Sequence, residues 1–212
     1  YNTKYFRAID LGPPGDYLVT LDPIDGTRYY MDGHPNYMII LTVLNADGFE
    51  GALALMPGRD RYYYSLRGEG TFTGSMDDAF DQCQPLKIEQ PENKVVLGWA
   101  LSPLADLVRS HYPVIDLKTE YSTKVAVPPI NGLLTGEVSG VILASAQFID
   151  TAALSFMAQE MGYCLSTYRG EPLPPLSQSK DYRWPGLIVS ANETMQQKLI
   201  EIMSSAKLPW ED

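Results

Sequence analysis

Apolar runs in the first part of the chain are short and bounded by turn residues, a pattern typical of β-strands. The first run, Tyr17-Leu-Val-Thr-Leu21, stops abruptly at Asp22-Pro23. Two later runs are joined by Asn45-Ala-Asp-Gly48, a turn sequence typical of β-hairpins. The pattern predicts strands over residues 17–21, 37–44, 49–56, 61–66 and 71–72.

The second part of the chain alternates between strand and helix patterns. Apolar residues with helical spacing occupy positions 153, 154, 157, 158 and 161, and Gly162 follows as a helix cap. Strands are predicted over residues 94–99, 141–143 and 187–192, and helices over 101–112, 151–161 and 193–205. A polar segment over residues 76–91, with a short edge strand at 86–88, separates the two parts. We predict a mixed α/β fold with an antiparallel-sheet lobe over residues 1–92 and a smaller α/β lobe over residues 93–212.

Charge and composition argue against several classes of function. The 212 residues are 45% hydrophobic and carry a formal net charge of −10, with basic side chains scattered singly. This distribution disfavours nucleic acid polymers and anionic membranes as partners. No apolar run reaches the roughly 18 residues of a membrane span. We therefore expect a soluble, cytoplasmic protein with no membrane attachment.

Cys83 and Cys164 form no metal-binding spacing, so ordinary thiols in a reducing compartment are expected. The opening residues, Tyr1 to Phe6, lack a methionine and already resemble the approach to a strand. We expect this start to be an interior point of a longer natural chain.

The segment from Asp22 to Thr27 reads Asp-Pro-Ile-Asp-Gly-Thr and directly follows the first predicted strand. Pro23 fixes its own φ and donates no hydrogen bond, while Gly26 permits backbone geometry closed to other residues. The carboxylates of Asp22 and Asp25 can face one side of such a turn, where their repulsion would raise a pKa. A hard cation such as Mg²⁺ or Mn²⁺ relieves that repulsion.

The backbone of the same turn offers further contacts. The carbonyl of Ile24 could add an oxygen ligand, and the N–H groups of Gly26 and Thr27 are suited to holding a phosphate. Asp-Pro and Asp-Gly are also common turn dipeptides. However, a chance match to Asp-Pro-x-Asp-Gly-Thr in a chain of this length is on the order of 10⁻⁴. We interpret the segment as a cation and phosphate site.

A further acidic residue, Asp150, opens a predicted helix that begins Asp150-Thr-Ala-Ala153. Alone, Asp150 is a good N-cap. Together with the upstream Asp-Pro-Ile-Asp-Gly-Thr, it resembles the inositol monophosphatase family. That family comprises lithium-sensitive, magnesium-dependent phosphatases related to fructose bisphosphatases and nucleotide 3′-phosphatases. Weaker matches follow in the same order at Gly68 to Phe72 and Val189 to Asn192, so the resemblance spans most of the chain.

The resemblance implies a fold, a site and a cofactor. The fold would be the layered α-β-α-β-α sandwich of the sugar-phosphatase type, with the N-terminal helical layer missing from this chain. The metal ligands would be Asp22, the carbonyl of Ile24, Asp25 and Asp150. Gly26 and Thr27 would contact phosphate, and Asp25 and Thr27 would be catalytic, Thr27 by orienting the attacking water. Two or three Mg²⁺ ions, replaceable by Mn²⁺, would activate that water, with lithium inhibition and a homodimer expected.

The sequence also departs from the family pattern. An N-terminal acidic pair and an earlier Asp that works with the threonine have no counterpart here. Ile149 stands where tryptophan usually precedes the downstream Asp, and the stretch Leu143 to Gln147 lacks the acidic residue that inositol-selective members use. Arg28-Tyr29-Tyr30 replaces a smaller polar pair. The fold expectation stands, but inositol phosphate as the substrate gains no support.

The expected function is magnesium-dependent hydrolysis of a small phosphorylated metabolite: an inositol phosphate, a sugar phosphate or a nucleotide 3′-phosphate. Arg28 or Lys124 could hold a second phosphate of a bisphosphate substrate. The alternative is a catalytically silent relative that acts as a metal- or protein-binding module. His34 and His111 are too few and too separated for a metal cluster, and the tyrosines at 62–64 are expected to pack within a sheet.

Overall fold

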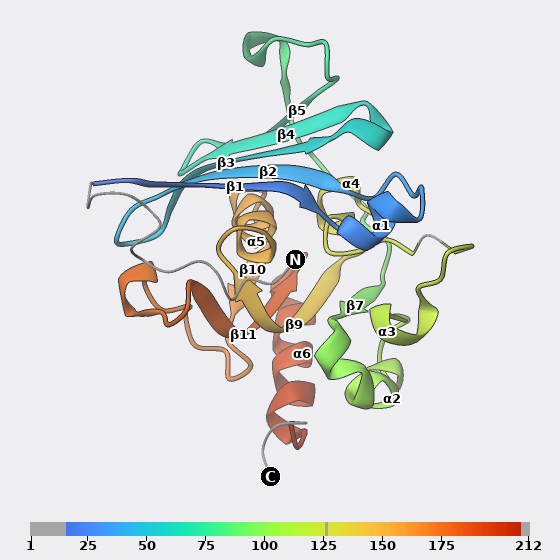
Figure 1. Cartoon of the computed structure of the whole chain (residues 1–212). Helices are drawn as coiled ribbons and strands as arrows, with labels where there is room; N and C mark the ends of the chain where they lie inside the picture. Colours follow the sequence, from blue (N-terminus) through green and yellow to red (C-terminus); the bar gives the residue numbers. More distant parts are fainter. Residues whose placement is uncertain (1–15, 126, 209–212) are drawn as a thin grey trace.

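A computed structural model describes residues 16–125 and 127–208 of the chain (Figure 1). The first half forms a six-stranded antiparallel sheet in which each strand pairs with the next along the chain. Its strands are β1 (Leu18–Asp25), β2 (Met38–Leu44), β3 (Phe49–Met56), β4 (Arg61–Leu66), β5 (Gly70–Gly74) and β6 (Gln84–Pro85). The predicted β2–β3 hairpin is closed by Asn45, whose side-chain oxygen accepts hydrogen bonds from the amides of Asp47 and Gly48 at 2.9 and 3.0 Å.

The second half forms a five-stranded mixed sheet in the order β10-β11-β9-β7-β8. β7 lies parallel to both β8 and β9, whereas β11 runs antiparallel to β9 and β10. Its strands are β7 (Val95–Leu97), β8 (Val114–Asp116), β9 (Gly140–Gln147), β10 (Cys164–Ser166) and β11 (Arg183–Ser190). Because β7 and β9 are parallel, the segments that follow them in the chain both begin at the same edge of this sheet.

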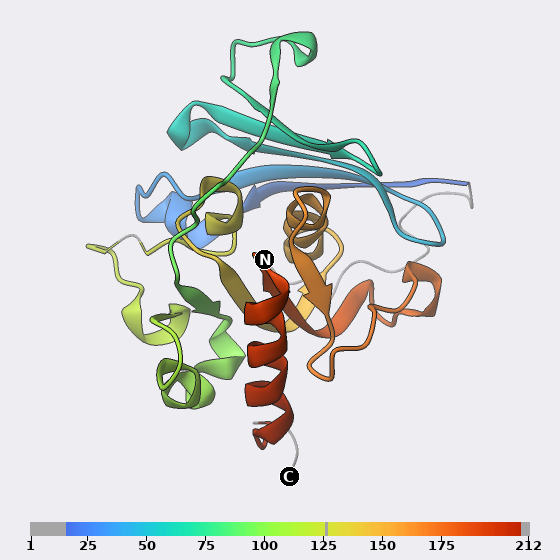
Figure 2. The same cartoon turned by 180° about the vertical axis from the view of Figure 1, so that it is seen from behind.

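Helices separate and cover the sheets. The α-helices are α1 (Thr27–Met31), α2 (Ala105–Arg109), α3 (Leu117–Glu120), α4 (Gly132–Thr135), α5 (Thr151–Glu160) and α6 (Glu193–Ser205). Short 3₁₀ helices are η3 (Pro57–Arg59), η4 (Phe80–Gln82), η5 (Trp99–Leu104) and η6 (Leu176–Gln178). Figure 1 places α5 between the two sheets, and Figure 2 shows α6 along the far side of the second sheet.

Helix α5 is the centre of the core. Every residue from Ala152 to Ala158 is buried, and the helix contacts strands of both sheets. Such a sequence, apolar on all sides, is stable only inside a protein. One hydrophobic cluster accordingly joins Met38 and Ala54 of the first sheet to Val141 of the second. The division into lobes at residues 1–92 and 93–212 stays a prediction, because the sheets separate there while their core is shared.

Two contacts fasten α5 to the first sheet. The carboxylate of Glu160 accepts hydrogen bonds from the amides of Gly68 and Gly70 at 3.0 and 3.2 Å, and the hydroxyl of Thr71 donates to the carbonyl of Met157 at 2.7 Å. The two glycines adopt positive φ, at 77° and 91°, which the tight β4–β5 turn requires. The glycines at 68 and 70 therefore serve a hairpin that docks on the helix.

The layered α/β sandwich expected from the sequence is confirmed. Layers of sheet, helix, sheet and helix follow one another, and within the described residues Figure 1 shows no helix over the outer face of the first sheet. The expectations for residues 1–15 lie outside the described residues. Within those residues, no helix is long and apolar enough to cross a bilayer.

Several element boundaries differ from the sequence prediction. The helix expected over 101–112 is split into η5 and α2, because Pro103 lies inside the segment and cannot donate a helical hydrogen bond. The edge strand expected at 86–88 lies at 84–85, and the Leu86 amide makes the last bond to Thr71 at 2.8 Å. The short elements β8, β10, α1, α3 and α4 were not predicted, since three to five residues carry little periodicity.

Candidate metal and phosphate site

The Asp-Pro-Ile-Asp turn is a β-bulge at the end of β1. Asp22 pairs with Ile40 and Asp25 with Met38, so three steps on β1 match two on β2. In a regular strand, residues three apart point to opposite faces of the sheet. The extra residue restores the parity, which lets Asp22 and Asp25 project toward the same side. β1 therefore ends four residues later than predicted, at Asp25, and the bulge is what creates the site.

The third carboxylate comes from the second half of the chain. After β9 ends at Gln147, Asp150 takes the N-cap position of α5 and its side chain accepts a hydrogen bond from the Thr151 amide. The hydroxyl of Thr151 accepts a bond from the Gln147 amide at 3.0 Å, which fixes the start of the helix. Ligand oxygens of Asp22, Asp25 and Asp150 all lie within 4.8 Å of one another. The structure thus brings together three side chains predicted to share an ion.

The electrostatics of this cluster are unfavourable for bare carboxylates. Burial, with the charges of Asp150 and Asp22 added, raises the pKa of Asp25 to about 8, although the Gly26 amide opposes the rise. Burial also raises the pKa of Asp22, opposed by the Ile24 amide, which donates to its carboxylate at 3.0 Å. The pKa of Asp150 is raised by burial and by Asp22, against the amide of Thr151.

These donors fit a hard divalent cation. Three carboxylates with raised pKa values gain most from a positive charge placed among them, and oxygen donors favour Mg²⁺ or Mn²⁺ over softer metals. The Thr27 hydroxyl donates to the carbonyl of Ile24 at 2.9 Å, which leaves that carbonyl one lone pair for a metal. The residues predicted as ligands therefore suit the ion on chemical grounds.

The phosphate side of the site begins where α1 starts. Gly26 has φ of 75°, and an added Cβ would lie 3.1 Å from the carbonyl oxygen of Asn36. Only glycine fits this position without strain. Gly26 is the N-cap residue of α1, and Thr27 is the first residue of that five-residue helix. Gly26 and Thr27 thus lie beside the acidic cluster, and their contacts to phosphate stay a prediction.

A pocket of about 320 Å³ opens next to Asp25, Gly26 and Thr151. Its walls also include Tyr29 and Leu143, which lie in stretches where the sequence departs from the family pattern. Sequence reasoning missed Trp99 and Asn131, which come from two distant segments and belong to no local motif. Three tyrosines and two histidines considered earlier lie elsewhere: Tyr62 and Tyr63 are buried in the sheet, and no histidine belongs to the acidic cluster.

Basic residues suggested for a second phosphate have different settings. The guanidinium of Arg28 lies 5.3 Å from the ring centre of Trp99 and 4.5 Å from that of Tyr121. Arg28 is therefore near the pocket, since Trp99 lines it. Lys124 donates through its backbone amide to the Ser122 hydroxyl at 3.3 Å, a contact that gives no direction to its side chain.

Comparison with known proteins places these features in context. The sequence profile of the inositol monophosphatase family matches residues 7–208. A "Putative Nus factor SuhB" from Neisseria meningitidis serogroup A is 25% identical over 198 residues, covering 90% of this chain and 70% of that protein. An inositol monophosphatase from Anabaena sp. PCC 7120 superposes with a TM-score of 0.67 at 16% identity, covering 92% of this chain and 77% of that one.

An IMPase/NADP phosphatase, solved with Mg²⁺ and phosphate, superposes with a TM-score of 0.65 at 16% identity, over 96% of this chain and 72% of that one. The sheet–helix–sheet sandwich therefore has the fold of these inositol monophosphatase structures. The chain belongs to the inositol monophosphatase family. Family membership and the acidic cluster support magnesium binding and phosphatase activity in general.

Proposed function

We propose that this chain hydrolyses a small-molecule phosphate monoester in a magnesium-dependent reaction. The observation that carries the proposal is that carboxylate oxygens of Asp22, Asp25 and Asp150 lie within 4.8 Å of one another. Asp22 and Asp25 lie at the end of β1 in the first sheet, and Asp150 follows β9 of the second sheet. A chain with net charge −10 repels an anionic ester unless cations reverse the local field. The cluster supplies the place where such cations would bind.

Each residue of the turn has a proposed role. Asp22, Asp25, Asp150 and the Ile24 carbonyl would hold the metal. Bound Mg²⁺ would lower the pKa of the attacking water and neutralise charge on the phosphoryl oxygens. The amides of Gly26 and Thr27 would hold the phosphate. Two or three ions, replacement by Mn²⁺ and inhibition by Li⁺ are expectations from the family resemblance.

Thr27 is suited to orienting water because of its hydrogen bond. Its proton is directed to the Ile24 carbonyl, so its oxygen is left to accept a hydrogen bond. A water donating to that oxygen is held with its lone pair available to phosphorus. Attack forms a new P–O bond, the P–O bond to the alcohol breaks, and the proton released by water ends on the alcohol oxygen. Inorganic phosphate and a free alcohol are the products, and no covalent phosphoenzyme is required.

The test is phosphate release from a panel of inositol, sugar and nucleotide 3′-phosphates with Mg²⁺. We expect turnover with Mg²⁺, none with a chelator, and a large loss for Asp25→Asn. Asp47→Asn, an exposed carboxylate on the β2–β3 hairpin, is the matched control. Equal turnover by Asp25→Asn and the parent chain would refute the proposal.

A second candidate is a catalytically silent, binding role. The name "Putative Nus factor" of the Neisseria relatives describes something other than hydrolysis for those proteins. Calorimetry separates the two candidates: a chain that binds neither Mg²⁺ nor phosphate favours the silent role. A cytoplasmic location and a homodimer remain predictions, which fractionation and light scattering would check.

A further inference from the structure

Helix α1 begins at Thr27, directly after Gly26, so its position sets where the proposed phosphate contacts lie. A helix of five residues is not stable alone in water, and contacts with the rest of the protein must hold it. Tyr29 is the buried residue of α1, whereas Tyr30 and Met31 are exposed. The placement of the phosphate turn therefore depends on what packs against Tyr29 and its neighbours.

Tyr121, from the second half of the chain, packs against this helix and is itself buried. The centre of its ring lies 4.8 Å from that of Tyr29 and 5.8 Å from that of His34, edge-on in both cases. The guanidinium of Arg28 lies 4.5 Å from the same ring centre. The hydroxyl of Tyr121 donates to the Asp32 carboxylate and lies 3.3 Å from the Arg28 carbonyl oxygen. One side chain thus contacts α1 from its second residue to its C-cap.

We propose that Tyr121 is a positioning residue for the proposed reaction. It holds α1, and through α1 the amides of Gly26 and Thr27, in a fixed place relative to Asp150. Because Asp150 heads the separate helix α5, only contacts between elements can set that placement. An offset of about 1 Å at a reacting group costs on the order of 10²-fold in rate. This inference rests on the proposed function; Tyr121 lines neither the pocket nor the acidic cluster and acts only through α1.

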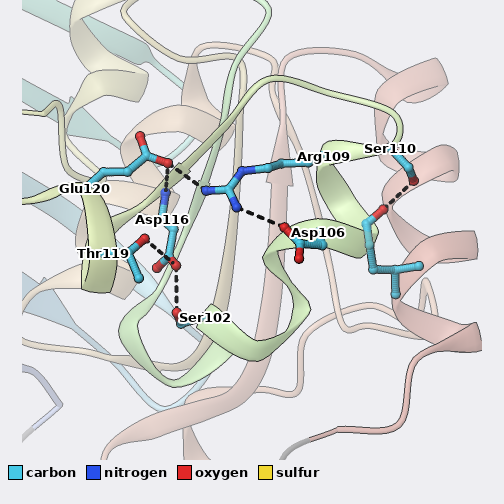
Figure 3. A network of polar contacts seen from close by, with 8 residues as sticks. Ser102, Asp106, Arg109, Ser110, Asp116, Thr119 and Glu120 are labelled. Atoms are coloured by element: carbon cyan, nitrogen blue, oxygen red, sulfur yellow. Dashed lines mark hydrogen bonds and ion pairs between the residues drawn. The ribbon is translucent and has the colours of Figure 1, made fainter.

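The segment that precedes Tyr121 is fixed by a network of polar contacts (Figure 3). Asp116, at the end of β8, is buried and accepts hydrogen bonds from the hydroxyls of Ser102 and Thr119 at 2.6 and 2.8 Å. Glu120, the last residue of α3, forms an ion pair with α2 at 2.8 Å. Tyr121 is the C-cap residue of α3 and follows directly. Its backbone is therefore tied to β8, η5 and α2, which makes it a firm support for α1.

A second contact follows at the next residue of the chain. The Nε2 atom of His34 lies 3.1 Å from the carbonyl oxygen of Ser122, which can only accept a hydrogen bond. The amide of His34 donates to the Tyr29 carbonyl at 2.8 Å, so this residue is also part of the turn that ends α1. Tyr121 and Ser122 together connect α1 and its closing turn to the second half of the chain.

Tyr121→Phe keeps the ring and removes the hydroxyl. With a hydrolysed ester in Mg²⁺, kcat should fall about three- to tenfold, and Tyr121→Ala, which also removes the ring, should lower kcat on the order of 10²-fold. KM should rise less than kcat falls, and the Kd for Mg²⁺ should change less than about threefold, because the proposed metal ligands lie outside α1. Tyr64→Phe is the matched control. It removes a hydroxyl that donates to the Phe80 carbonyl at 3.3 Å, and should keep kcat within about twofold.

Substitutions of Asp32 separate the hydrogen bond from a general loss of packing. Asp32→Ala should lower kcat as Tyr121→Phe does, whereas Asp32→Asn keeps an acceptor oxygen and should retain kcat within about twofold. The double variant Tyr121→Phe/Asp32→Ala should be about as active as the less active single variant, because both changes remove one bond. Effects that multiply in the double variant would overturn the inference. A lower Tm for Tyr121→Ala with kcat unchanged would show a merely structural role and would also overturn it.

Hydrogen exchange keeps this inference separate from the proposed function. The amide of Asp32 donates to the Arg28 carbonyl at 3.0 Å within the α1 turn. In Tyr121→Ala with Mg²⁺ it should exchange at least about tenfold faster than in the parent. The amide of Leu154, which donates to the Asp150 carbonyl at 3.2 Å, should exchange as in the parent and thereby exclude global unfolding.

Tyr121→Phe takes the place of the alanine variant in this measurement if the latter does not fold. If the parent chain hydrolyses no ester, the proposed function fails and the exchange rates alone judge the hold of Tyr121 on α1. Unchanged exchange of the Asp32 amide would then refute that hold, and faster exchange confined to α1 would support it.

Discussion

Replacing Asp25 by asparagine should stabilise the metal-free protein at alkaline pH while removing its response to magnesium. The pKa of Asp25 is raised from an ordinary 3.8 to about 8. Between these values the folded chain holds a proton that the unfolded chain has released. The free energy of unfolding of the metal-free protein therefore falls as pH rises from about 4 to about 8, and the penalty is complete above that range.

The size of the effect follows from the same two values. One pKa unit corresponds to about 1.4 kcal/mol, so the ceiling near pH 8 is about 5 kcal/mol. Asp25 as a residue is partly exposed, although its carboxyl group faces the other two acids. Water penetration lowers the ceiling, and we expect Asp25→Asn to be about 2–3 kcal/mol more stable than the parent at pH 8. At pH 4 the two should agree within about 0.5 kcal/mol.

Urea unfolding with a chelator, at pH 4 and at pH 8, measures this difference directly. Magnesium at 1,000 times its Kd should then reverse the order at pH 8, because it adds about 4.1 kcal/mol to the parent and little to the variant. Asp47→Asn controls for a general change in charge. A variant equally stable or less stable than the parent at both pH values would refute the account of the acidic cluster, as would an identical response to magnesium.

Substitutions at three further positions test the remaining contacts. Thr27→Val should lower kcat by about 10²–10⁴ with Mg²⁺ affinity nearly unchanged, whereas Thr27→Ser should retain activity; steady-state kinetics with a Mg²⁺ titration decides. Asp150→Asn should weaken Mg²⁺ binding at least about tenfold by calorimetry, and unaltered affinity would exclude it as a ligand. Glu160→Gln should lose about 1–2 kcal/mol in urea unfolding, because the amides of Gly68 and Gly70 lose a charged acceptor. Its phosphate release should stay within about twofold of the parent's, and a stability equal to the parent's would show that the carboxylate does not fasten the hairpin.

Local pattern was sufficient for the long elements. The helix predicted over 193–205 is α6 residue for residue, and the strands around Asn45 match β2 and β3 closely, because alternation and turn chemistry are strong signals there. It was insufficient where a single residue changes the outcome. Pro103 interrupts an amphipathic segment, and the bulge at Asp22 to Asp25 extends a strand that the sequence pattern ends before Pro23.

For the site, the motif indicated its own chemistry but not its surroundings. The meeting of Asp25 and Asp150 was expected from the resemblance, and their roles as ligands stay a prediction. The pocket was not foreseen, because Trp99 and Asn131 are unremarkable one by one and Tyr29 was noted only as a departure from the family pattern. They line the same pocket only because of the register of β7 with β9 and the position of α1.

The position of α5 between the sheets ties cation binding to completion of the core. Asp22 and Asp25 belong to one sheet, while Asp150 heads a helix that follows a strand of the other. An ion shared by all three would act as a non-covalent staple across the interior, and neither half could bind it equally well alone. Magnesium would therefore stabilise only the molecule in which the two sheets are packed together. A higher magnesium concentration would make their separation rarer.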